Sequence, residues 1–267
     1  MGGVQEIMRH RIRAAWVERS PVLPSHAKWG TSVKTRPEEC SMSPVITVHH
    51  LEMSRSTRIL WALEELGTPY ELEVYKRHRK TFRAGPEIKA IHPVGRFPVV
   101  VIDGQAFAES GAILEHLAER FGALAPTDPT ARVHYRYWMH FAEGSLMAPL
   151  LVGLIMDRLR TGVPFPANAI TGAIGKAVNK QYTWPQLADL LSAVNHHLAA
   201  HAFFSGDTFS MADIQMSYPG MAAIDRVPNA REAYPALRTW CETMKARPAY
   251  IKALEVGGPI LPPSRKT

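Results

Sequence analysis

Residues 95–110 of the chain read GRFPVVVIDGQAFAES, and this stretch carries the clearest signals for the fold. Val99–Ile102 is a continuous β-branched run, which is typical of a buried strand. Asp103-Gly104 predicts a hairpin turn that leads into a short strand at Ala106–Ala108. The stretch therefore predicts an antiparallel pair of strands that ends just before a new helix.

The residues just before and just after this strand pair suit a ligand. Pro98 stands at the start of a predicted central strand, where a proline cannot donate to the ladder. A cis Phe97–Pro98 bond would turn the Phe97 backbone outward to pair with a ligand, although cis bonds are rare. Glu109 and Ser110 begin the next helix, whose N-terminus offers free N–H groups and partial positive charge. Helix capping is the simpler role for this acid and hydroxyl.

The segment before residue 95 adds two more strands. Val45–Val48 predicts a strand, and a helix with apolar residues at helical spacing follows it and stops at Gly67. Tyr70–Tyr75 alternates apolar and charged side chains, as a half-buried strand does. A short helical piece lies near Pro86–Ala90. Residues 44–122 therefore predict an α/β domain of the order βαβαββα, with its first two strands parallel.

The rest of the chain is predicted to be helical. Residues 123–129 (ALAPTDP) form a linker by composition. Residues 130–255 show helical patterns without strands, and 256–267 form a coil tail. We expect helices over Ala131–Leu159, Trp184–His201, Met211–Ile224 and Ala236–Ala246.

Residues 1–43 differ from both predicted domains. They contain four arginines between positions 9 and 19 and several prolines, but no apolar core of a secretory signal. An Arg-rich targeting peptide is one interpretation, which Glu6 and Glu18 argue against. The interpretation we favour is a flexible extension, or an upstream start read in place of Met42.

The formal net charge of +7 does not form a continuous basic face, because residues 1–41 alone hold seven basic and four acidic residues. We therefore expect no nucleic-acid partner. One basic cluster remains, which is either a solvated loop or an electropositive rim for a small anionic ligand. The apolar stretch Leu146–Met156 is broken by Pro149 and is far shorter than the roughly 20 residues that span a bilayer, so we expect no membrane partner. The basic cluster comprises Lys76, Arg77, Arg79, Lys80, Arg83 and Lys89.

Common catalytic motifs are missing from the sequence. CxxC, GxGxxG, GxxxxGK[ST], HExxH and GxSxG do not occur, and the twelve histidines show no metal-ligand spacing. We therefore expect no metal site, and chemistry that arrives with a cosubstrate. One further hydroxyl stands out, because Ser54 lies in the turn between the first strand and the first helix. Helix capping is its simpler role, and Ser56 competes for it.

Taken together, these segments resemble the cytosolic glutathione transferases, in particular a serine-type, theta-like branch found in fungi and bacteria. The resemblance covers about residues 44–255 and implies a thioredoxin-like N-terminal domain followed by an all-helical domain. In the helical half, Ser210 and Asp213 resemble the capping box of the family. The matching stretches are SRSTRILWALEELGTPYEL (54–72), HPVGRFP (92–98), AESGAI (108–113), FSGD and SMAD (204–213), YPALRTW (234–240) and ARPAY (246–250).

The resemblance implies that Ser54 donates a hydrogen bond to the sulfur of glutathione. Phe97, before a cis Pro98, would pair through its backbone with the cysteinyl part, and Glu109 and Ser110 would hold the γ-glutamyl ammonium and carboxylate. Phe97 departs from the small aliphatic residue usual in the family, at slight cost because the contact is through backbone. The first strand–helix turn has no cysteine, which argues against the cysteine-type classes. The implied glutathione-binding residues are Arg96, Phe97, Pro98, Glu109 and Ser110.

The second substrate and the partners are also implied by the resemblance. The long helix after the linker would line the pocket for a hydrophobic electrophile, with Tyr137 and Phe141 as candidates; packing in the helix core is their alternative role. We expect a cytoplasmic homodimer that uses glutathione as cosubstrate and needs no other cofactor.

Two functions are compatible with these residues. The first is an enzyme that uses the glutathione thiolate for conjugation or for peroxide reduction. The second is a binding or interaction module that keeps the fold without turnover. The sequence favours the enzyme, because a pure scaffold need not retain Ser54, Pro98, Glu109 and Ser110.

Overall fold

The computed structural model describes residues 44–78 and 84–260. Contacts divide the chain between Met42 and Ser43, and the described residues belong to the second of these units. The predictions for residues 1–43, for Arg79, Lys80 and Arg83 of the basic cluster, and for residues 261–267 lie outside the described residues.

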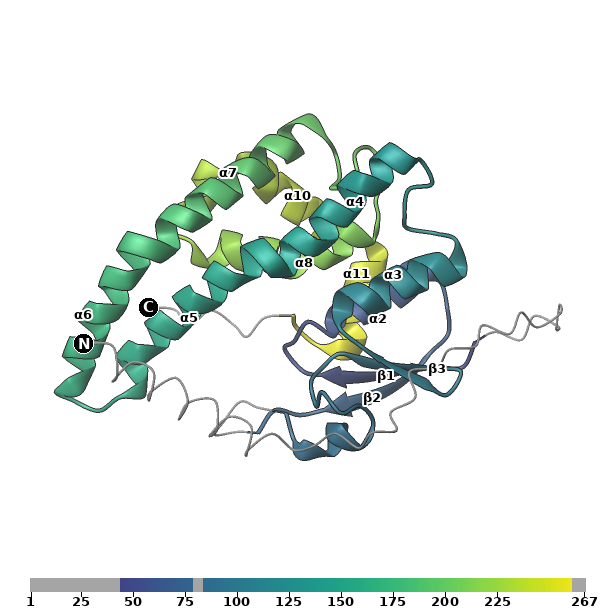
Figure 1. The fold of residues 1–267 in the computed structure, drawn as a ribbon, viewed down its shortest axis with the longest axis horizontal. Coiled ribbons are helices and arrows are strands. Elements are labelled where there is room, and N and C mark those ends of the chain that lie inside the picture. The colour runs from purple at the N-terminus through teal and green to yellow at the C-terminus, as the bar shows by residue number, and fades with distance from the viewer. Residues whose placement is uncertain (1–43, 79–83, 261–267) are drawn as a thin grey trace, which may run out of the picture. The chain divides into compact units, whose positions relative to one another are not determined.

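A four-stranded mixed sheet with the order β2-β1-β3-β4 forms the N-terminal domain (Figure 1). The two β-branched runs became the central strands β1 (Ile46–Leu51) and β3 (Val99–Ile102), because central strands need apolar side chains on both faces. The edge strands β2 (Glu71–Tyr75) and β4 (Gln105–Ala108) are more exposed and carry polar residues. As predicted, β1 and β2 are parallel, and this sheet with its helices is thioredoxin-like.

The register of the sheet decides which loops meet. Because β1 and β3 are antiparallel, His49 near the end of β1 lies opposite Val99 at the start of β3. Val99 in turn lies opposite Ala108 at the end of β4. Three segments therefore lie at the same end of the strands, which is called the sheet edge below. They are the turn after β1, the Phe97–Pro98 dipeptide before β3, and the Glu109–Ser110 pair after β4.

Two helices cover one face of this sheet (Figure 1). The first, α2 (Thr57–Leu66), buries its apolar stripe and ends at Gly67, which has the left-handed φ of 62° that the predicted stop requires. The second, α3 (Ser110–Phe121), follows β4 directly. Between β2 and β3 the chain forms the short 3-10 helix η1 (Pro86–Ala90).

The C-terminal domain is all-helical, as predicted. The long helix expected over Ala131–Leu159 is two α-helices joined by a π-helical turn, η2. The described elements of the C-terminal domain are α4 (Pro129–Phe141), η2 (Ala142–Leu146), α5 (Met147–Gly162), α6 (Ala167–Val178), the π turn η3 (Asn179–Thr183), α7 (Trp184–Ala200), α8 (Met211–Arg226), α9 (Ala230–Ala233), α10 (Pro235–Lys245) and α11 (Pro248–Gly257).

Helices α6 and α11 were not predicted individually. The α6 sequence, ANAITGAIGKAV, contains two glycines and lacks a charged face, so it gives a weak helical signal. α11 runs to Gly257, two residues past the predicted end of the helical domain at residue 255. It packs along α2, so this helix of the C-terminal domain returns to the N-terminal domain (Figure 1).

The continuous helical run Pro129–Leu159 is long and apolar enough to cross a membrane by length and composition alone. It exceeds the stretch 146–156 considered from the sequence because the helix continues upstream through the π turn. Its side chains Trp138, Phe141 and Leu146 are buried in the hydrophobic core, and a core helix meets the same test of length and composition.

A buried carboxylate joins three parts of the helical domain. Ser210 caps α8 within the predicted capping box, and the Oδ2 of Asp213 accepts the Ser210 N–H at 2.9 Å. Its Oδ1 accepts the N–H of Phe204 at 3.0 Å and the indole N–H of Trp240 at 3.1 Å. Burial raises the pKa of Asp213 to about 6, against the opposing effect of these donors. The carboxylate thus connects the loop before α8 to α10.

We expect Asp213→Ala to lower the free energy of unfolding by about 3 kcal/mol or more, because it leaves several buried N–H donors unpaired. Asp128→Ala is the matched control, since Asp128 caps α4 at an exposed site and, among the described residues, its side chain accepts the Ala131 N–H alone. Its expected cost is about 1 kcal/mol. Chemical denaturation measures both, and equal losses would show that Asp213 acts as a cap alone.

Candidate active site

The turn after β1 places two serine hydroxyls side by side. The Oγ atoms of Ser54 and Ser56 lie 2.7 Å apart, and the Ser54 Oγ also accepts the Ser56 N–H at 3.2 Å. Ser56 is completely buried and does not cap α2 through its side chain, whereas Ser54 keeps 7% of its surface exposed. Of the two hydroxyls left open by the sequence, Ser54 is the outer one.

Arg77 holds this turn in place. Its Nε donates to the carbonyl of Glu52 at 3.0 Å, and its Nη2 donates to the carbonyl of Met53 at 2.9 Å. Met53 has a φ of 52°, a left-handed conformation that is uncommon for a side chain of this kind. One member of the predicted basic cluster therefore supports the backbone that presents Ser54.

The predicted residues at the start of β3 lie at the same edge of the sheet. The Phe97–Pro98 bond is cis, and the Phe97 ring contacts Tyr75 at the end of β2, with ring centroids 4.9 Å apart. Pro98 is buried and Arg96 is exposed. This arrangement leaves the Phe97 backbone at the edge where the turn after β1 ends.

Glu109 and Ser110 complete this edge. Glu109 is exposed and has a φ of 71°, so a non-glycine residue is held in the left-handed region there. Such strain is found mostly at functional sites. Ser110 is buried at the first turn of α3, and its Oγ accepts a hydrogen bond from Arg58 at 3.2 Å. The structure thus brings together all five implied glutathione-binding residues and Ser54.

Arg58 is a site residue that sequence reasoning missed. Its side chain in α2 has no exposed surface, and its Nη1 donates to Oε1 of Glu143 at 2.6 Å. Its guanidinium also lies 5.4 Å from the ring centre of Tyr218 in α8. Among the described residues, its Nε and Nη2 find no hydrogen-bond partner. No local pattern signals this pair, because Glu143 is 85 residues away.

Glu143 lies in the π turn η2 and connects the helical domain to the site. Arg55 also donates to its carboxylate. Burial acts to raise the pKa of Glu143, but the charges and hydrogen bonds of Arg58 and Arg55 overcome this effect and lower it below the ordinary value of 4.5. The carboxylate therefore stays ionised between two guanidinium groups, one of which contacts Ser110.

The two candidates for the second-substrate pocket lie in α4. Tyr137 is 52% exposed and Phe141 is buried at 6%. Their rings contact each other, with centroids 5.6 Å apart, and both contact Trp138. The structure gives no contact between these rings and the Ser54 turn within the described residues.

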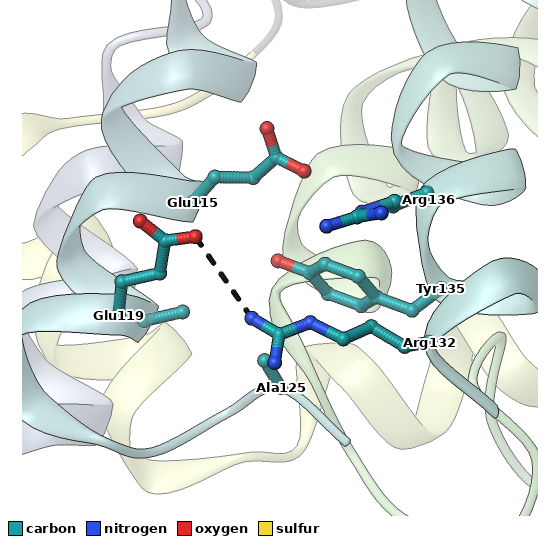
Figure 2. Close-up of a pocket in the computed structure, with 7 residues that line it drawn as sticks. Glu115, Glu119, Ala125, Arg132, Tyr135 and Arg136 are labelled. Carbon is teal, nitrogen blue, oxygen red and sulfur yellow. Dashed lines mark ion pairs between the residues drawn. The ribbon is translucent and has the colours of Figure 1, made fainter. Parts of the chain in front are cut away.

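A small polar pocket lies between α3 and α4, away from this edge (Figure 2). Glu119 and Arg132 face each other across it at 3.9 Å, and Glu115 and Arg136 carry one further charge of each sign. The Tyr135 hydroxyl points into it and has no hydrogen-bond partner among the described residues, and burial raises the pKa of Tyr135. None of the predicted site residues lines this pocket.

Comparison with known proteins gives the family. The N-terminal domain model of glutathione S-transferases matches residues 53–120, and the C-terminal domain model matches residues 169–248. The chain is 36% identical over 214 residues to glutathione S-transferase 3 of Schizosaccharomyces pombe, an alignment that covers 79% of this chain and 87% of that protein. The chain belongs to the glutathione S-transferase family. By that membership it is classed as a glutathione transferase.

Further relatives of this transferase agree. Glutathione S-transferase 1 of Saccharomyces cerevisiae is 31% identical, and the alignment covers 79% of this chain and 95% of that protein. A crystal structure of a glutathione S-transferase from Actinobacillus pleuropneumoniae has a TM-score of 0.67 at 30% identity and covers 84% of this chain and 97% of that one. Ure2p in complex with glutathione shares the fold, with a TM-score of 0.64 at 21% identity, covering 80% of this chain and all of that one.

We expect Glu143→Ala to lower the free energy of unfolding of this transferase by about 3–5 kcal/mol, because Arg58 is left charged and buried. Asp225→Ala, which removes an exposed ion pair with Arg231, should cost about 1 kcal/mol or less. Because the folded-state pKa of Glu143 is lowered, its contribution is present above pH 4.5 and lost as the pH falls below that value. Denaturant titrations across this range measure the difference, and a pH-independent cost below that of the control would contradict the assignment.

Proposed function

We propose that this protein binds glutathione along the sheet edge described above and uses Ser54 to hold the glutathione sulfur as a thiolate. The observation that carries the proposal is the register His49–Val99–Ala108, which gathers the Ser54 turn, Phe97–Pro98 and Glu109–Ser110 at one place. Three segments with ligand-binding groups then face one elongated tripeptide.

The chemical task is to ionise a thiol near neutral pH. A free thiol has a pKa of about 8.5, so little thiolate exists at pH 7. Lowering this pKa by about two units needs roughly 2.7 kcal/mol. A hydrogen bond from the Ser54 hydroxyl, together with the N-terminus of α2 nearby, is of this size. Ser54 therefore stabilises the anion and does not act as a nucleophile.

The remaining groups position the tripeptide. The Phe97 backbone pairs with the cysteinyl part, and the exposed Arg96 lies at the glycyl end. The γ-glutamyl carboxylate meets Ser110 and the N–H groups at the start of α3, while the Glu109 carboxylate takes the ammonium. The buried charge of Arg58, bonded to the Ser110 hydroxyl at 3.2 Å, supports an anion at this position.

We expect Ser54→Ala to lower kcat at neutral pH about 10-fold or more and to raise the pKa of the bound thiol by about one unit or more. A loss of about 1.36 kcal/mol in thiolate stabilisation corresponds to a tenfold change in rate and to one unit of pKa. Turnover of an aryl halide and the ultraviolet absorbance of the thiolate measure these effects. S-methylglutathione is the matched control: it has no thiol, so both proteins should bind it equally. An unchanged rate and pH profile in Ser54→Ala would mean that another group holds the sulfur.

For the second substrate, we infer that a small apolar electrophile or hydroperoxide lies against α5. In the π turn η2, which leads into this helix, Glu143 bonds to Arg58 and to Arg55, the neighbour of Ser54 in the chain. At the other end of this helix Arg158 acts electrostatically on Arg77, which holds the same turn. Leu151 and Ile155, one helical turn apart on the face of Arg158, are 48% and 47% exposed. They offer an apolar surface next to the thiolate.

We also propose a cytoplasmic homodimer, with the exposed face of α4 as its contact. Val133 is 67% exposed and Tyr137 is 52% exposed on this face. The pocket of Figure 2 next to it carries two acidic and two basic side chains. A two-fold contact sets the acids of one subunit against the bases of its partner, so the patch is self-complementary. Tyr137 then belongs to the contact between subunits.

Leu151→Ser and Tyr137→Ser separate the two surfaces. We expect Leu151→Ser to raise KM for an apolar electrophile several-fold and leave KM for glutathione and the molecular mass unchanged. Tyr137→Ser should weaken the dimer, measured by light scattering at decreasing concentration, without changing KM for the electrophile. The opposite pattern would place the second substrate at α4, as the sequence first indicated.

The second candidate is a glutathione-binding module without turnover. The fold it shares with Ure2p in complex with glutathione makes this outcome worth testing. Retention on immobilised glutathione without turnover of any aryl halide or hydroperoxide would favour the binding module, and turnover would favour the enzyme.

A further inference from the structure

A chain of hydrogen bonds runs inward from Ser54 to the end of the last helix. The Ser54 Oγ lies 2.7 Å from the Ser56 Oγ, which lies 2.8 Å from Nδ1 of His50. On the other side of the ring, Nε2 of His50 lies 2.7 Å from the carbonyl oxygen of Gly257. His50 and Ser56 have no exposed surface. The chain therefore connects the surface hydroxyl to a completely buried imidazole.

The carbonyl of Gly257 sets the tautomer of His50 at the inner end of this chain. A carbonyl only accepts, so Nε2 of His50 carries a hydrogen, and Nδ1 of the neutral ring is an acceptor. The Ser56 hydroxyl then faces two acceptors, Nδ1 at 2.8 Å and the Leu51 carbonyl at 3.2 Å, and Nδ1 is the shorter contact. The Ser56 oxygen accepts the Leu51 N–H at 3.1 Å. With the Ser56 hydrogen on Nδ1, the Ser54 hydroxyl donates to the Ser56 oxygen, so both hydroxyl hydrogens are directed inward toward the ring.

We propose that His50 takes up the thiol proton of glutathione through Ser56 and Ser54. The proposal rests on the function proposed above, in which Ser54 faces the sulfur. His50 does not touch the substrate; it acts through the two serines and positions their hydrogens.

The transfer balances at every atom. The thiol S–H bond breaks and its proton joins the Ser54 oxygen, whose own hydrogen passes to the Ser56 oxygen. The Ser56 hydrogen passes to Nδ1 of His50. At the end every donor has reversed: His50 donates to Ser56, Ser56 to Ser54, and Ser54 to the thiolate. The site as a whole stays neutral relative to its starting state, with the charges separated by two hydroxyls.

The surroundings of His50 suit a ring that is neutral at rest and charged only opposite an anion. The pKa of His50 lies below its ordinary value of 6.5, because burial outweighs the opposing effects of the Gly257 carbonyl and the charge of Glu52. Within the described part of the chain, Glu52 is the charged group that acts on this ring. The ring nitrogens face the hydroxyl of Ser56, at the N-cap of α2, and the carbonyl of Gly257 in α11. The C-terminus of α11 favours a cation at this place.

Close packing explains why the His50 ring contacts a backbone carbonyl at residue 257. A Cβ at Gly257 would lie 2.4 Å from Leu60 and 3.1 Å from the His50 ring. Only glycine lets the end of α11 approach so closely, and this approach gives the imidazole its fixed tautomer.

The test counts protons. Glutathione is added to the full-length protein at pH 7 in weak buffer; a pH indicator measures released protons and ultraviolet absorbance measures thiolate. S-methylglutathione gives the proton release of binding alone, which is subtracted. We expect the wild type to release clearly fewer than one proton per thiolate formed, because His50 retains the rest.

His50→Gln and His50→Asn are the informative variants, because each amide can keep one of the ring's hydrogen bonds and neither can accept a proton. We expect both to release one proton per thiolate and to form several-fold less thiolate at pH 7. His49→Gln is the matched control, since His49 is the neighbour in β1 and, within the described residues, its ring hydrogen-bonds to the Tyr75 hydroxyl and not to the serine turn. It should keep the wild-type ratio. Circular dichroism and melting confirm that each variant is folded.

The outcomes separate this inference from the proposed function. One proton per thiolate in the wild type would overturn the role of His50 and leave Ser54 in place. No thiolate in the wild type would overturn both. If Ser56→Ala, which breaks the chain between His50 and Ser54, kept the wild-type ratio, the proton would travel by another route and the inference would also fail.

Discussion

A buried charge links the two domains of this transferase at the candidate site. Moving a guanidinium out of water is costly unless a carboxylate and further acceptors meet it. Arg58 in α2 meets this need with Glu143 from the helical domain and Ser110 from α3. The long helix changes to a π turn at the residues that include Glu143, and π turns often occur at functional sites. The site therefore depends on a contact that neither domain makes alone.

Local patterns predicted the parts of the fold that local physics decides. Two β-branched runs became the central strands, Gly67 stopped α2, and Ser210 with Asp213 formed the capping box. The meeting of Pro98 and Ser110 also follows from sequence, because the hairpin brings the start of β3 beside the end of β4. The place of Ser54 beside them was implied by the family resemblance. In contrast, α6 has too many small residues and glycines to show a helical stripe, so its tertiary packing decides its structure.

The residues that support the site were beyond the reach of the sequence for a different reason. His50 meets a carbonyl 207 residues away, and Arg77 meets the turn 24 and 25 residues before it. An arginine in a basic run and a histidine in a strand do not indicate a role at the site until their hydrogen-bond partners are known. The π turn adds a second obstacle: it shifts the helical periodicity between α4 and α5, so a face assigned at Tyr137 cannot be extended to Leu151.

The contact between His50 and Gly257 also bears on how the chain is made. Domains generally fold as they leave the ribosome, with the N-terminal one first. The sheet edge that gathers Ser54, Pro98 and Ser110 can form at that stage, but the buried imidazole lacks its carbonyl until α11 has been synthesised. The nascent protein therefore has the strands of its site before it has the groups that complete it, and synthesis of α11 sets the moment at which the proposed proton acceptor is in place.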